Sequence, residues 1–241
     1  MRVTMLSAVI VIVSGFVSAA RADIAPGPGP GPQNLDWPEH WAVTQGPQPQ
    51  LQIRDADVKV NLSRAGDGAI MAKVSCTFEM KCVRGIASPV SRSLLFPMYE
   101  GARTDKREKE FSVKADGKQL PKFRATWTPK GSLQKYVAFQ FNSSFTKDQT
   151  QKITVDYSLL LPMQDNQAKF TYILRSAAEW SGPVVQETVR VKADKGLEIK
   201  AIVAPDGKLK VKEQQGELVW VLKNAVPTED INVGIATTAG N

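Results

Sequence analysis

Histidine and cysteine are scarce in this chain. Its 241 residues include one histidine, His40, and two cysteines. Zinc sites are built from several closely spaced His or Cys ligands, and a Ser or Cys nucleophile needs a base within hydrogen-bond reach. His40 lies in a leader outside the expected core, so it serves neither purpose. We therefore predict no catalytic residue, no metal site and no cofactor, and we expect a protein that is not an enzyme.

Long apolar stretches are also missing beyond the N-terminus. Leu6–Val17 is apolar and follows the positive charge of Arg2, but it is too short to span a bilayer comfortably. Ala20-Arg21-Ala22 fits the small-x-small cleavage rule, and Val17-Ser18-Ala19 offers an alternative site. Residues 1–22 are predicted to be a signal peptide, with maturation at Asp23. The mature chain should have no transmembrane segment and should be exported to the bacterial periplasm or the extracellular space.

Residues 23–50 are predicted to form a spacer rich in proline and glycine. The stretch APGPGPGPQ has no apolar periodicity, and alternating Pro with Gly favours an extended surface segment. Further on, Asp36 and Glu39 have the spacing of a capping box, which would place Trp37 and Trp41 on one face of a short helical turn. The two indoles would either dock on the following domain or form an exposed aromatic pair that recognises a partner or a membrane interface.

Helical periodicity is absent beyond the leader, and from Leu51 onward the apolar residues recur with a period of two. From Ile70 to Cys82 every second residue is apolar or cysteine, and the residues between are mostly polar or charged. Strands recur about every 10 to 15 residues, with Gly, Asp or Pro between them. The predicted fold is all-β, an antiparallel β-sandwich (Ig-like or larger). It would occupy residues 51–237 as one unit, or as two halves divided near residue 129, with a tail at 238–241.

Several local features are predicted within this domain. Asp116-Gly117 should form a tight hairpin turn, and residues 197–222 should form a meander of three short strands. Asp55-Ala56-Asp57 should lie on a strand at a surface edge and not bind calcium. Phe170–Val191 should be two strands joined by a loop. Trp180, in that loop, would cover the end of the core or serve as a platform for a ligand.

The segment F-x-Y-x-L at Phe170–Leu174, followed by Trp180-Ser181-Gly182 and alternating valines, resembles a group of bacterial secreted proteins of the domain-of-unknown-function type. Leu94-Leu95-Phe96-Pro97-Met98 resembles the group's hydrophobic-Phe-Pro strand end. The likeness covers roughly residues 55 to 192. It implies an export signal and a β-sandwich, and it assigns no role to any residue because the group has no established activity.

Cys76 and Cys82 lie on the same predicted strand. Six residues of straight strand span about 20 Å, whereas a disulfide needs Cα atoms within about 7 Å. We therefore expect two buried thiols, with a disulfide only if the strand breaks near Lys81.

The charge balance is moderately basic, with a formal net charge of +7. Lys208, Lys210 and Lys212 should form a solvated face; the alternative is a face that attracts an anionic envelope polymer or lipid. Nucleic-acid binding is not expected. Our first hypothesis is an exported, non-catalytic protein that binds another envelope component or has a structural role in the envelope. The alternative is a hydrolase that uses paired carboxylates on cell-envelope polysaccharide.

A pull-down tests the role of the leader. Mature protein, Asp23 to Asn241, would be exposed to envelope extract beside the variant Trp37→Ala/Trp41→Ala. If the aromatic pair recognises a partner, the wild type retains that partner and the variant loses it. Equal retention by both proteins would place recognition in the sandwich instead.

Overall fold

The computed structural model describes residues 25–26, 50–66, 68–84, 90–99, 110–127, 136–174, 181–203 and 207–238. The predicted signal peptide and nearly all of the predicted spacer lie outside these ranges. So do Trp37, Trp41 and Trp180, and residue 129. Their roles remain predictions.

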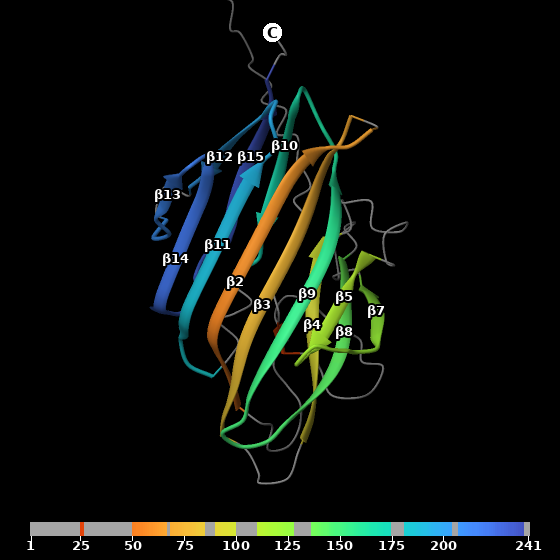
Figure 1. Ribbon diagram of the computed structural model, residues 1–241, viewed down its shortest axis with the longest axis vertical. Helices are drawn as coiled ribbons and strands as arrows, with labels where there is room; N and C mark the ends of the chain where they lie inside the picture. The colour runs from red at the N-terminus through yellow and green to blue at the C-terminus, as the bar shows by residue number, and fades with distance from the viewer. Residues whose placement is uncertain are drawn as a thin grey trace, which may run out of the picture.

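One layer of the molecule is a sheet of eight strands in the order β13-β14-β11-β2-β3-β9-β5-β6, called here the large sheet (Figure 1). Its longest strands, β2, β3 and β9, lie next to one another at its centre. The bounds are β2 (Gln50–Arg64), β3 (Ile70–Arg84), β5 (Ser112–Ala115), β6 (Lys118–Gln119), β9 (Thr150–Leu161), β11 (Val184–Ala193), β13 (Val211–Gln214) and β14 (Glu217–Ala225).

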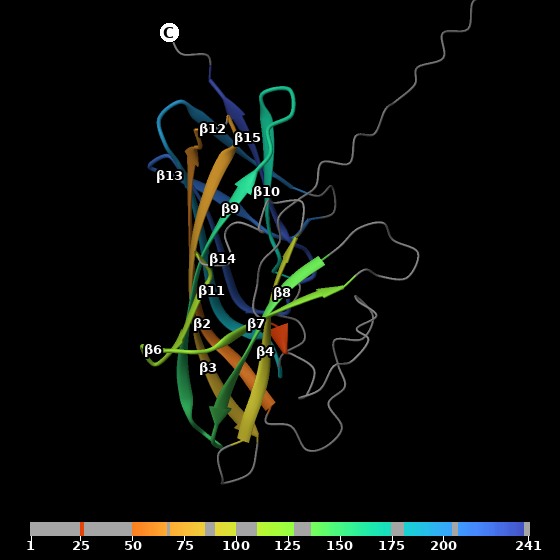
Figure 2. The same ribbon diagram turned by 90° about the vertical axis from the view of Figure 1, so that its right-hand side faces the viewer.

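The second layer consists of two smaller sheets that lie on the same side of the large sheet (Figure 2). A three-stranded sheet has the order β10-β15-β12, and a four-stranded sheet has the order β1-β4-β8-β7. The bounds are β10 (Gln167–Tyr172), β12 (Leu197–Ile202), β15 (Ile231–Thr237), β1 (Ala25–Pro26), β4 (Val90–Tyr99), β7 (Lys122–Trp127) and β8 (Tyr136–Phe145). This layered all-β architecture confirms the predicted fold class. No helix able to cross a bilayer occurs in the described part of the chain.

Strand β3 shows how the core follows from the sequence. Its alternate side chains Ile70, Ala72, Val74, Cys76, Phe78, Met80 and Cys82 are all buried, and the side chains between them are exposed or half-buried. Successive residues of a strand point to opposite faces, so one face of the large sheet is apolar and the other is polar. The apolar face is the one that the two smaller sheets cover.

A β-bulge in β2 explains why its apolar residues change parity. Ile53 pairs with Met80 and Asp55 pairs with Glu79, so Arg54 is an extra residue in the ladder. An extra residue shifts the following side chains to the other face. Ile53 and Ala56 therefore both face the core, although an unbroken strand would point them in opposite directions.

Three features of the pairing differ from the sequence-based expectations. The predicted meander over 197–222 is wrong, because β12 pairs with β15 in the three-stranded sheet while β13 pairs with β14. Strand β2, with Asp55 and Asp57, is not at an edge, because it pairs with β3 on one side and β11 on the other. The pairing of β2 with β11 is parallel, so the sandwich is not entirely antiparallel.

Other expectations agree with the structure. Asp116 and Gly117 both have positive φ between β5 and β6, as a tight hairpin turn requires. Lys208, Lys210 and Lys212 are exposed. The N-terminal segment also contributes one unpredicted element, because Ala25–Pro26 pairs with Leu94 and Leu95 of β4.

Thiol counting tests the state of the two cysteines. Cys76 and Cys82 are both buried in β3, and the structure holds them as thiols that are not joined to each other. A thiol reagent should therefore react with neither residue in the native protein and with two thiols after denaturation. If denatured, non-reduced protein shows no titratable thiol, the two residues form a disulfide and this part of β3 is not a regular strand.

Candidate functional site

A groove with a volume of about 720 Å³ lies on the outer face of the three-stranded sheet. The central strand of that sheet is β15, and its two residues that line the groove from this face, Gly234 and Ala236, have little or no side chain. Gly234 pairs with Lys169 of β10 on one side and with Lys200 of β12 on the other. Long side chains on two flanking strands thus form the walls, and the backbone of β15 forms the floor.

Gly234 has no evident role in maintaining the fold. Its φ is not in the left-handed region, and a Cβ added there would meet Cδ1 of Ile202 at 3.5 Å and the carbonyl oxygen of Lys200 at 3.7 Å, which are ordinary contacts. Glycine within a strand costs roughly 0.5–1 kcal/mol relative to alanine. Glycine in this setting often marks a place where a ligand approaches the backbone closely. The space above β15 is therefore the strongest candidate for a ligand site.

The chemistry of the side chains that line the groove changes along the strands. Two residues from Gly234 along β15, Ala236 pairs with Glu198, and Asp165 lies at this same end of the groove. At the opposite end Ile202 lines the groove and remains 48% exposed. The groove thus has an acidic end, a central pair of lysines and an apolar end.

A tight turn positions the acidic end. Asp165 and Asn166 have φ values of 50° and 60°, as expected for the two central residues of a type I′ turn. The flanking residues close this turn with two backbone hydrogen bonds, from Gln164 N to Gln167 O at 2.8 Å and from Gln167 N to Gln164 O at 2.9 Å. Asp165 therefore projects from a turn of defined geometry at the start of β10.

Beneath the three-stranded sheet lies a buried carboxyl group. Glu187 of β11 is fully buried, and the hydroxyl of Tyr172 on β10 donates a hydrogen bond of 3.2 Å to its Oε1 atom. Its Oε2 atom has no hydrogen-bond partner among the described residues. Burial raises the pKa of Glu187 from 4.5 to about 8, a rise that the hydrogen bond from Tyr172 opposes and the charge of Asp55 reinforces. This carboxyl group is therefore neutral at pH 7 and connects the two layers.

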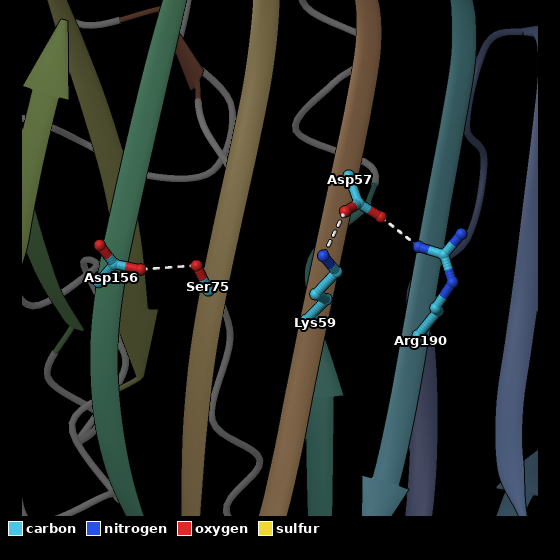
Figure 3. A network of polar contacts seen from close by, with 5 residues as sticks. All are labelled: Asp57, Lys59, Ser75, Asp156 and Arg190. Carbon is cyan, nitrogen blue, oxygen red and sulfur yellow. Dashed lines mark hydrogen bonds and ion pairs between the residues drawn. The ribbon is translucent and has the colours of Figure 1, made fainter. Parts of the chain in front are cut away.

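The polar face of the large sheet carries a different group of contacts (Figure 3). Asp57 pairs with Lys59 on its own strand and with Arg190 on β11, and Ser75 on β3 donates a 2.6 Å hydrogen bond to Asp156 on β9. Ser75 has a carboxylate partner, and the described part of the chain contains no histidine that could act as its base. These contacts join β2 to β11 and β3 to β9, and cross-strand pairs of this kind contribute up to about 1 kcal/mol each.

The described lining of the groove includes none of the sequence-predicted site residues. Trp37, Trp41 and Trp180 lie outside the described residues, and Cys76 and Cys82 lie in the core. The described residues contain no cluster of His, Cys, Asp or Glu suited to a metal ion. Two signals were available in the sequence and missed. Glycine in the interior of Ile231–Thr237 marks the groove, and Glu187 shares the parity of the buried residues Val189 and Val191.

Substitution of Glu187 should change how stability depends on pH. Between pH 4.5 and about 8 folded Glu187 keeps its proton while the unfolded chain loses it, so stability falls as the pH rises through this range. Glu187→Gln removes this dependence. The change that it causes in the free energy of unfolding should be more stabilising at pH 8 than at pH 4, by on the order of 4 kcal/mol. Urea unfolding of both proteins from pH 4 to 9 measures the free energy of unfolding at each pH.

Glu79→Gln, on the exposed face of β3, is the matched control and should leave the pH profile unchanged. If the free energy of unfolding changes with pH in the same way for the wild type and Glu187→Gln, Glu187 is not neutral in the folded protein.

Comparison with known proteins supports the fold. No family model matches the chain, and no curated protein is significantly similar in sequence. A proposed nutrient binding protein from Legionella pneumophila has a similar structure, with a TM-score of 0.65 and 15% identity over 92% of this chain and 72% of that chain. An M1 zinc metallopeptidase from Deinococcus radiodurans matches with a TM-score of 0.37 and 11% identity, over 79% of this chain and 43% of that chain. The first likeness shows that this fold occurs in a solved structure.

Proposed function

We propose that the chain is an exported, non-catalytic binding protein that holds a small ligand in the groove on the outer face of the three-stranded sheet. The observation that carries this proposal is Gly234. It sits at the centre of a strand, where an added Cβ would make only ordinary contacts, and it opens the floor of a groove of about 720 Å³. That volume lies within the range of small-molecule sites.

Two further observations support a binding role. The groove presents a few charged groups beside one exposed apolar side chain, Ile202, and this combination orients ligands in binding sites. The structurally similar Legionella protein is itself a proposed nutrient binding protein. Export would expose the groove to compounds in the periplasm or the medium. The proposed location rests on the signal peptide predicted at residues 1–22.

A carboxylate-based hydrolase acting on cell-envelope polysaccharide is the second candidate. It is favoured by one observation, that Asp165 and Glu198 line the same groove. Glycoside hydrolysis uses two carboxyl groups on either side of the scissile bond. Release of soluble sugar from purified envelope polysaccharide, abolished in both Asp165→Asn and Glu198→Gln, would establish it.

Filling the groove tests the binding proposal. Mature wild type and Gly234→Val would be dialysed against a defined mixture of amino acids, dipeptides, sugars, sugar acids and organic phosphates, and the retained compounds identified by mass spectrometry. The wild type should retain at least one compound that the variant does not. Because valine suits a strand and glycine does not, the variant should unfold in urea at the same concentration as the wild type or a higher one.

Ser158→Val is the matched control, since it adds an apolar side chain to the outer face of the large sheet. It should retain the same compounds as the wild type. If Gly234→Val retains every compound that the wild type retains, or if the wild type retains none, the groove is not a binding site for these classes.

A further inference from the structure

The proposed function does not say which class of ligand binds. The order of charges along the groove restricts the classes that can fit. We propose, on the basis of that function, that the groove takes a zwitterionic ligand of dipeptide length, with its carboxylate between Lys169 and Lys200 and its ammonium group beside Glu198 and Asp165.

Register places the two lysines opposite each other. Lys169 and Lys200 both pair with Gly234, from opposite sides. Neighbouring strands are about 4.8 Å apart, so the two lysine backbones are separated by roughly 10 Å. Gly234 adds no side chain between them, and the side chain of Ile202 lies against one side of the glycine. Two long ammonium-bearing side chains can reach a carboxylate held over the glycine from both sides. Charge-assisted hydrogen bonds of this kind are among the strongest available to a protein.

Spacing sets the length of the ligand. Glu198 precedes Lys200 by two residues on the same face of β12, and two residues of strand span about 7 Å. Two residues of extended peptide also span about 7 Å. A dipeptide can therefore place its carboxylate at the lysines and its ammonium group at Glu198, whereas the two charges of a single α-amino acid are too close together.

Charge excludes other ligand classes. Among the described residues that line the groove, the ionisable side chains are two lysines and two carboxylates, so their charges cancel. A polyanion would meet Glu198 and Asp165 as like charges, and a neutral sugar would leave all four groups without a charged partner. Ile202, exposed at the lysine end, would contact the second side chain of the dipeptide, which should be apolar.

Alanyl-leucine is the probe that fits this description. Its affinity for the mature protein would be measured by titration calorimetry, beside N-acetyl-alanyl-leucine, which lacks the ammonium group, and alanyl-leucine amide, which lacks the carboxylate. Each modification should weaken binding by about tenfold or more, the factor expected from loss of one charge-assisted contact. Leucine alone should bind more weakly than the dipeptide.

Charge-removing variants assign each contact. Lys169→Gln/Lys200→Gln should bind alanyl-leucine and alanyl-leucine amide equally well. It should still bind alanyl-leucine more tightly than N-acetyl-alanyl-leucine. Asp165→Asn/Glu198→Gln should show the reverse pattern. Lys152→Gln, an exposed lysine of the large sheet, is the control and should change neither preference.

Equal affinity for the dipeptide and both modified forms, or equal loss of both preferences in each variant, would overturn the inference. So would the absence of dipeptide binding. If another compound is retained by the wild type and lost in Gly234→Val, only the ligand class is wrong. If Gly234→Val leaves all retention unchanged, the proposed function fails as well.

Discussion

The apolar face of the large sheet must be removed from water, and this requirement determines where the other elements lie. Strand β3 alone contributes seven buried side chains to that face, and burial of apolar surface is the main favourable term in folding. Two separate small sheets meet the requirement. Each uses one face to cover the core, so its other face is available for a different purpose.

The three-stranded sheet shows this division of roles within single strands. In β15, Ile231, Val233 and Ile235 are buried against the core, while Gly234 and Ala236 face outward and leave space between the lysines of the neighbouring strands. In β10, Tyr172 contacts buried Glu187 and Lys169 lines the groove. The same strands therefore connect the groove to the interior of the sandwich, and the fold holds the flanking lysines at a spacing fixed by the backbone ladder.

The local sequence pattern was sufficient to predict strands and turns, but it was not sufficient to predict which strands pair with each other. The alternation from Ile70 to Cys82 and the Asp116-Gly117 turn depend on residues close in sequence, and both were predicted correctly. The bulge at Arg54, the parallel pairing of β2 with β11 and the placement of β12 beside β15 depend on strands distant in the chain. The groove escaped prediction for the same reason, because Lys169, Lys200 and Gly234 become neighbours only through long-range pairing.

Mapping of backbone amide shifts would locate the bound ligand on the protein. Isotope-labelled mature protein would be titrated with alanyl-leucine, and the amide resonances followed by two-dimensional NMR. If the groove is the binding site, the largest shift changes fall on Lys169, Lys200, Gly234 and their neighbours in β10, β12 and β15. Changes confined to the polar face of the large sheet, around Lys59, Ser75 and Arg190, would place the site elsewhere and contradict the assignment of the groove.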